Sequence, residues 1–242
     1  MQDSVPLAGQ VVVVTGAGSG LGAALCQQLA AERAHVFAFD INEPGLREMA
    51  SRLSDDGMDV QAMAGDVGTV ADVQAIFKEA TVQHGGVDAV INCAGIDVTA
   101  PIEDVDVDDW ERVLRTNLTG PFILSKLALA ALRPSGHIVN VASTAARRGW
   151  PNASAYHASK WGLAGLSQAL HAELRPRGIR VSVVIAGGMQ TPFLLDRFPD
   201  IDVMSLQDPA RVARAICFVL TQPEDSVVPE IMVLPMKETS WP

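Results

Sequence analysis

The stretch that decides the fold is Thr15-Gly16-Ala17-Gly18-Ser19-Gly20-Leu21-Gly22, which follows the apolar run at 11–14 and opens an apolar helical pattern. That order is typical of a buried strand, a tight turn and a helix. Glycines let the backbone of such a turn approach a ligand closely, and the first amides of the helix can face an anionic diphosphate. We therefore predict a dinucleotide site here; the alternative is a tight turn without a ligand.

An acidic residue comes twenty positions after Gly20. Asp40 ends the apolar run at 36–39, where a carboxylate can accept hydrogen bonds from the adenosine ribose. The same carboxylate would repel a 2′-phosphate, and neither Ser19 nor the pair Ile41-Asn42 supplies a compensating positive charge. These residues favour NAD over NADP, whereas Asp40 taken alone could be a surface carboxylate.

Short β-branched runs alternate with longer amphipathic stretches along the whole chain. This alternation is typical of βαβ units, so we predict an α/β fold with one doubly wound, seven-stranded parallel sheet and helices on both faces. No linker or repeat is evident, and residues 1–242 are expected to form one domain with ligands beyond the carboxyl ends of the strands. The expected strands are 11–15, 35–40, 60–64, 89–92, 137–141, 180–185 and 231–234, and the expected helices are 20–31, 44–53, 70–84, 107–131, 155–174 and 208–221.

Composition excludes several classes of protein. A formal net charge of −10 argues against binding to nucleic acid or to anionic lipid, and the apolar stretch at 122–132 is too short and too polar to span a membrane. Cys26, Cys93 and Cys217 are scattered and odd in number, and the five histidines form no metal-binding pattern. We expect a reduced, cytoplasmic protein without a catalytic metal.

Two residues of the expected helix 155–174 suggest proton transfer. Tyr156 and Lys160 are four positions apart, so both side chains leave the same helix face. An ammonium beside a phenol favours phenolate, which predicts a pKa for Tyr156 below its ordinary value of about 10. Such a group suits general acid/base catalysis; the alternative for Lys160 is a solvated surface charge.

These motifs together resemble the short-chain dehydrogenase/reductase family, in its compact single-domain form with a Rossmann-type fold. The resemblance covers essentially the whole chain. It is carried, in the family's order, by the glycine turn, Asp66-Val67, Asn92-Cys93-Ala94-Gly95, Asn117, Ser143 and Tyr156-x-x-x-Lys160.

The resemblance implies four catalytic residues. Tyr156 would exchange a proton with the substrate oxygen, and Ser143 would hydrogen-bond the same oxygen. Lys160 would lower the pKa of Tyr156 and contact the nicotinamide ribose, while Asn117 would interrupt a long helix and hold a water that links Lys160 to solvent. Individually, Ser143 could instead cap a loop and Asn117 a helix.

The resemblance also implies a cofactor site. Asp66 would bond the adenine amino group with Val67 beside it, Asn92, Ala94 and Gly95 would line the middle of the cofactor, and Thr191 would contact the carboxamide. The complete set of expected cofactor residues is Gly16, Ser19, Gly20, Leu21, Gly22, Asp40, Ile41, Asp66, Val67, Asn92, Ala94, Gly95, Tyr156, Lys160, Gly187 and Thr191.

The implied reaction is the NAD-dependent interconversion of a secondary alcohol and a ketone, with a small-molecule substrate. One alternative is an NADPH-dependent 3-oxoacyl-type reductase, which Asp40 and the unusual carboxyl-terminal segment 228–235 oppose. Another is a catalytically silent protein that senses NAD. The complete set of proton-transfer residues argues against that alternative.

Substrate choice and assembly depend on further segments. The connection 188–207 is long enough to be a lid over an apolar site, or a self-packed hairpin of helices. Arg147 and Arg148 could bind an anionic substrate group or nothing specific. Small and apolar residues on the helices 107–131 and 155–174 predict a homo-oligomer, a tetramer or else a dimer; those residues could also face only their own sheet.

Overall fold

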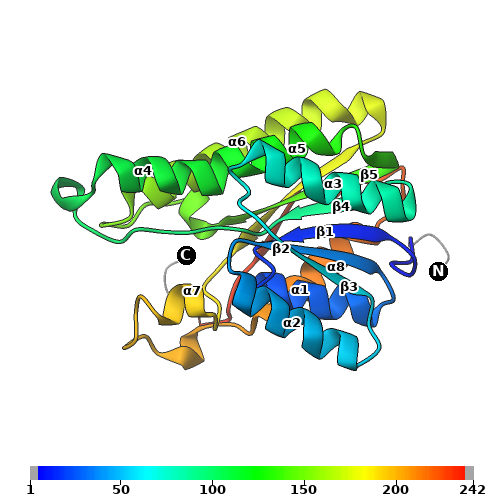
Figure 1. The fold of residues 1–242 in the computed structure, drawn as a ribbon. Helices are drawn as coiled ribbons and strands as arrows, with labels where there is room; N and C mark the ends of the chain where they lie inside the picture. Colours follow the sequence, from blue (N-terminus) through cyan, green and yellow to red (C-terminus); the bar gives the residue numbers. More distant parts are fainter. Residues whose placement is uncertain (1–4, 238–242) are drawn as a thin grey trace.

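The computed structural model describes residues 5–237 and is built around a seven-stranded sheet (Figure 1). All strands are parallel, in the order β3-β2-β1-β4-β5-β6-β7. The order reverses between β1 and β4, which places the ligand-binding crevice at their carboxyl ends. The strands are β1 (Val11–Thr15), β2 (His35–Asp40), β3 (Val60–Ala64), β4 (Val87–Asn92), β5 (Leu132–Ser143), β6 (Arg180–Ala186) and β7 (Glu230–Val233).

Helices cover both faces of this sheet, as predicted (Figure 1). One face carries α1 (Gly20–Ala31), α2 (Glu43–Asp55) and α8 (Pro209–Leu220); the other carries α3 (Val70–His84), α4 (Val107–Leu114), α5 (Gly120–Ala128) and α6 (Ser154–Leu174). The short helix α7 (Pro192–Leu195) lies beyond the strand ends. The doubly wound single-domain fold is therefore confirmed.

The core explains why the first four residues of β1 are all apolar. Successive side chains of a strand point to opposite faces, so Val12 and Val14 enter the apolar cluster under α1 and α8. Val11 and Val13 enter the cluster under α3 and α5. Each face is buried by helices, and a strand buried on both faces has no polar alternation.

Two elements differ from the prediction, while the others match within two residues. The expected helix 107–131 is divided into α4, the π-helical turn η2 (Arg115–Thr119) and α5. Pro121 has no N–H, so a regular helical hydrogen bond to the carbonyl of Asn117 cannot form. Strand β5 begins at Leu132 rather than 137, because Pro134 and Gly136 hide its irregular first half from sequence patterns.

Along residues 5–237, no helix is long and apolar enough to cross a membrane. In the same residues, no three His, Cys, Asp or Glu side chains come together as a possible metal site.

Candidate active site

The glycine turn packs directly against the loop after β4. Gly16 and Gly20 have φ values of +68° and +52°, which side-chain-bearing residues rarely adopt. A Cβ on Gly16 would lie 2.7 Å from the Cα of Ala94, and one on Gly22 would overlap the carbonyl oxygen of Gly16. Thr15 completes the junction, since its Oγ1 accepts hydrogen bonds from Cys93 N at 3.1 Å and Ala94 N at 3.2 Å.

The N-terminus of α1 fits the diphosphate of a dinucleotide. Ser19 is the N-cap residue, and its side chain makes no capping hydrogen bond. The first turn of α1 carries no acidic residue that could neutralise the helix dipole. Backbone N–H groups at this helix start therefore remain available for an anionic ligand, at the wall of a cavity lined by Ser19, Gly20, Leu21 and Gly22.

Asp40 holds the turn and borders the same cavity. Its Oδ2 accepts a hydrogen bond from Gly18 N, and its Oδ1 accepts one from Asn42 N, each at 2.8 Å. A carboxylate oxygen can accept more than one hydrogen bond, so Asp40 keeps acceptor capacity toward the cavity. The adjacent lining residues Ser19 and Ile41 carry no charge.

The next acidic residue along this end of the cavity is Asp66. It accepts hydrogen bonds from Gly68 N at 2.8 Å and from Arg115 Nη2 at 3.0 Å. Its neighbour Val67 packs against Gly120, where an added Cβ would lie 2.8 Å from Val67 Cγ2. The π-helical turn thus contacts the Asp66-Val67 loop through Arg115.

The proposed proton-transfer residues come from two elements. Ser143 ends β5, and Tyr156 and Lys160 lie one turn apart on α6. Lys160 Nζ donates to the carbonyl of Val141 at 2.9 Å and lies 5.6 Å from the centroid of the Tyr156 ring. Tyr156 and Lys160 are both buried.

Burial, rather than Lys160, controls the acidity of Tyr156. Burial raises the pKa of Tyr156 to about 12; a hydrogen bond with Ser143 and the charge of Arg197 act the other way, and Asp97 adds to the rise. Burial also lowers the pKa of Lys160 to about 8. The predicted lowering of the Tyr156 pKa is therefore wrong for the protein's own groups, because desolvation outweighs the charges nearby.

Asn117 lies in the π-helical turn with its side chain fully buried. Its Oδ1 accepts from Ile96 N at 2.8 Å, and its Nδ2 donates to Ile96 O at 2.8 Å and to Ser159 Oγ at 3.0 Å. A Cβ on Gly95 would lie 3.5 Å from Asn117 Oδ1 and 3.6 Å from Lys160 Nζ. The side-chain amide is thus occupied, and only the main-chain carbonyl lacks its regular helical donor.

Asn92 is placed behind the cavity wall rather than along it. Its Nδ2 donates to Asn140 Oδ1 at 2.7 Å, Asn140 Nδ2 donates to Ser167 Oγ at 2.9 Å, and Ser167 Oγ donates to Leu163 O at 2.7 Å. The chain of bonds joins β4, β5 and α6. The structure thus assigns the side chain of Asn92 to the core and not to direct cofactor contact.

One large cavity of about 1040 Å³ brings the other predicted residues together. It is larger than a typical pocket for a drug-sized ligand. Asn92 and Asn117 are the expected residues that do not line it. Those that do are Gly16, Ser19, Gly20, Leu21, Gly22, Asp40, Ile41, Asp66, Val67, Ala94, Gly95, Ser143, Tyr156, Lys160, Gly187 and Thr191.

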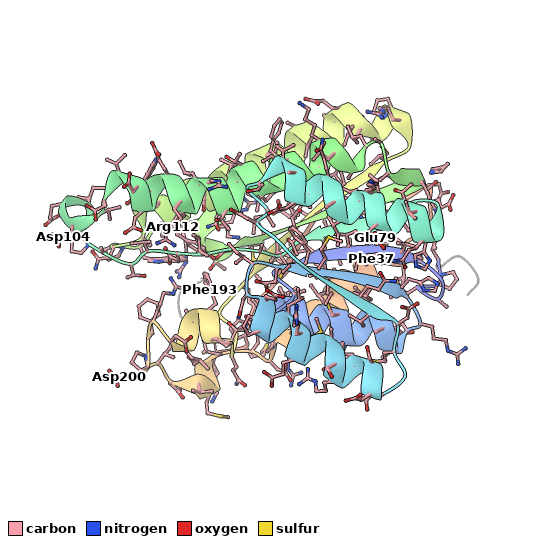
Figure 2. All side chains as sticks on the ribbon, in the orientation of Figure 1. Phe37, Glu79, Asp104, Arg112, Phe193 and Asp200 are labelled. Atoms are coloured by element: carbon pink, nitrogen blue, oxygen red, sulfur yellow. The ribbon has the colours of Figure 1, made fainter. Side chains whose placement is uncertain are left out.

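The connection 188–207 is both self-packed and part of the cavity wall. Its ends are bridged by hydrogen bonds from Gln190 N to Gln207 O at 2.9 Å and from Gln207 N to Gly188 O at 3.1 Å. Phe193 lines the cavity, with its ring centroid 5.9 Å from that of Tyr156. Figure 2 shows Phe193 and Arg112 on the two sides of this space. Met204 is 70% exposed and does not line the cavity.

An ion pair joins this connection to the loop after β4. Arg197 bonds Asp97, whose side chain is 6% exposed, and it also bonds Thr99 Oγ1 at 3.4 Å. The Arg197 guanidinium lies 4.1 Å from the centroid of the Phe193 ring. Asp97 was not predicted as a site residue and Arg197 was assigned no partner, because a pair one hundred residues apart leaves no local signal in the sequence.

The two adjacent arginines have different surroundings. Arg147 donates to Ala146 O at 2.8 Å and forms an ion pair with Glu230. Arg148 lines the cavity together with Trp150. Burial raises the pKa of Cys93, which also lines the cavity, to about 12, so its thiol stays protonated at neutral pH.

Comparisons with known proteins agree with this geometry. The family model described as short chain dehydrogenase matches residues 10–202. The chain is 36% identical over 198 residues to 3β-hydroxysteroid dehydrogenase 1 of Eggerthella lenta, covering 80% of this chain and 76% of that protein. It is 34% identical over 245 residues to the glycine betaine reductase of Emericella nidulans, covering 96% of this chain but only 19% of that larger protein.

A solved structure extends the likeness to three dimensions. The crystal structure of an actinorhodin polyketide ketoreductase variant with NADPH superposes with a TM-score of 0.88 at 28% identity, covering 96% of this chain and 98% of that one. The sequence match, the fold and the residues gathered in the cavity lead to one conclusion: the chain belongs to the short-chain dehydrogenase/reductase family of oxidoreductases.

Proposed function

We propose that this protein is an NAD-dependent oxidoreductase that interconverts a secondary alcohol and a ketone. The observation that carries the proposal is the single cavity that joins the glycine turn to Ser143, Tyr156 and Lys160. A dinucleotide held at the turn would reach the proton-transfer residues at the other end of that cavity.

The chain's own residues would position the substrate and move one proton. Ser143 would donate a hydrogen bond to the substrate oxygen. The positive charge of a bound oxidised nicotinamide would oppose the effect of burial on the pKa of Tyr156, so that Tyr156 as phenolate would accept the hydroxyl proton during oxidation. Nicotinamide, when bound, would supply the acceptor for the hydride, so the alcohol would lose one hydride and one proton and become a ketone. In reduction, Tyr156 as phenol would return the proton to the oxygen.

Lys160 and Asn117 would support this exchange. Lys160, fixed by the Val141 carbonyl, would contact the nicotinamide ribose. The main-chain carbonyl of Asn117, which lacks its regular helical donor, is our proposed binding point for the water that links Lys160 to solvent. This places the water on the backbone rather than on the side-chain amide.

The preference for NAD rests on Asp40. Its carboxylate borders the cavity and is fixed by the Gly18 and Asn42 amides, so it cannot turn away from a 2′-phosphate without breaking two hydrogen bonds. NADPH-dependent reduction of a ketone is the second candidate, because the ketoreductase structure described above carries NADPH.

The test measures cofactor reduction by the absorbance of the reduced nicotinamide. The protein is given NAD or NADP, each with a panel of secondary alcohols, hydroxy acids, sugars and steroids. We expect turnover with NAD and little with NADP. Asp40→Asn should reduce this preference for NAD. Turnover with NADP alone would overturn the role of Asp40, and NAD binding without turnover across the panel would favour a sensor.

We further propose a homo-oligomer, a tetramer or else a dimer, formed through α5 and α6. Phe122 on α5 is 47% exposed and Trp161 on α6 is 52% exposed, which is unusual for large apolar side chains. A Cβ added to Gly165, near Trp161 on α6, would meet no atom of another element within 4 Å. Light scattering after gel filtration measures the assembly, and a monomeric mass would contradict it.

A further inference from the structure

Arg148 places a positive charge at the substrate end of the cavity, and its side chain has no ion-pair partner among residues 5–237. It lines the cavity, its Nε is buried without a hydrogen-bond partner, and it forms no salt bridge within these residues. An unpaired buried donor is costly, so a ligand that supplies the missing acceptor would be stabilised here.

Local packing fixes the position of Arg148. Its backbone N–H donates to Thr144 O at 3.2 Å, which ties it to the residue after Ser143. Its guanidinium lies 5.6 Å from the centroid of the Trp150 ring. At this distance a cation–π contact can hold the side chain without consuming any of its N–H donors.

Trp150 is in turn held by the helix that carries Tyr156. The rings of Trp150 and His157 lie 4.3 Å apart, and Trp150 N donates to His157 Nε2 at 3.2 Å. His157 Nδ1 lies 2.7 Å from Ala153 O, so the proton sits on Nδ1 and Nε2 is free to accept. Ala100 N donates to Asn152 O at 2.9 Å, which closes this loop against the segment after β4.

Two other positive charges that line the cavity are already engaged, and Lys237 also lines it. Arg197 is neutralised by Asp97, and Lys160 donates to Val141 O. Phe193 and Phe198 add apolar surface, which strengthens an ionic contact by excluding water. The chain as a whole is strongly acidic, so a free guanidinium here is a local feature of the site.

We infer that Arg148 binds the carboxylate of the substrate, so that the natural substrates are hydroxy acids and the corresponding oxo acids. A guanidinium pairs with a carboxylate through two parallel hydrogen bonds, and a single positive charge matches a single negative one. This inference rests on the proposed function, since it names the substrate class of the same site.

The test compares matched substrates in matched variants. Linear hydroxy acids, with increasing separation between hydroxyl and carboxylate, are assayed beside their neutral amides in the wild type, Arg148→Gln and Arg148→Lys. Arg147→Gln is the control. It removes the same charge at the neighbouring position, and the side chain of Arg147 does not line the cavity.

We expect the wild type to prefer the best acid over its amide. Arg148→Gln should lower kcat/KM for that acid by roughly 10- to 100-fold with little change for the amide. Arg148→Lys should recover part of the loss, because it keeps the charge and loses the planar fork. Arg147→Gln should leave the acid-to-amide ratio unchanged.

A second measurement does not require turnover. Succinate and glutarate should raise the Tm of the wild type in the presence of NAD, and should raise that of Arg148→Gln less. If neither the acid-to-amide ratio nor the Tm shift depends on Arg148, the carboxylate site is wrong. If neutral alcohols are still oxidised, only the carboxylate site is wrong and the proposed oxidoreductase function stands. If no alcohol is oxidised, that result counts against the oxidoreductase function itself.

Discussion

The two ends of the cavity are built from different parts of the chain. At the cofactor end, main-chain atoms set the positions: Gly16 packs on Ala94, and an added Cβ on Gly22 has no room. At the substrate end, the shape of the cavity depends on contacts between side chains from distant segments, such as the ion pair of Asp97 with Arg197. Positions at which the backbone packs this closely accept few residue types, whereas a pair of contacting side chains can be replaced by another pair. The cofactor end can therefore stay constant while residues at the substrate end change.

The largest effect is expected at Tyr156, where the two ends meet. Tyr156→Phe removes the proton donor and acceptor but keeps the ring that packs near Phe193. We expect kcat to fall by about 10²- to 10⁴-fold with the Kd for NAD nearly unchanged. Stopped-flow and equilibrium binding measure the two quantities. Unchanged turnover would remove Tyr156 from the chemistry.

One added methyl group should have different effects at the two ends of the cavity. Gly22→Ala should weaken NAD binding and lower the free energy of unfolding by about 1–3 kcal/mol, because the new Cβ overlaps the Gly16 carbonyl. Gly149→Ala, at the substrate end, has open space around it and should change stability by less than about 0.5 kcal/mol. Calorimetry with and without NAD checks both; equal effects would refute a backbone-built cofactor end.

Breaking the ion pair should affect only the substrate end. Arg197→Met leaves Asp97 buried without its counter-ion and frees the connection 188–207 from the loop after β4. We expect kcat/KM for the substrate to fall roughly tenfold while the Kd for NAD is preserved. A double-mutant cycle with Asp97→Asn measures the coupling. An equal loss of NAD affinity would contradict the separation of the two ends.

The smallest effect is a shift in pH dependence. Asp97 raises the pKa of Tyr156 and Arg197 lowers it. Ketone reduction requires the phenol, so its kcat/KM should decline as pH rises through that pKa. Asp97→Asn should move the decline to lower pH, and Arg197→Met should move it to higher pH. Shifts in the same direction would show that these charges do not act on Tyr156.

The parts of the site that could be predicted from the sequence are those whose geometry is determined by local patterns. The glycine turn, Asp40 and the Tyr156–Lys160 spacing are local, and the structure brings them to one cavity. The break at η2 was anticipated only as an interruption by Asn117, although Pro121 is the residue whose missing N–H prevents the regular bond. The acidity of Tyr156 could not be read from its neighbour in the helix, because burial is a property of the whole fold.

Helix α6 is bonded to the rest of the molecule at several depths. Ser167 accepts from Asn140, Ser159 accepts from Asn117, and Lys160 donates to Val141. A slide of α6 by one helical turn, about 5.4 Å, would break all three of these buried hydrogen bonds at the same time. The three bonds therefore fix the axial position of α6, and with it the height of Tyr156 and Lys160 relative to Ser143.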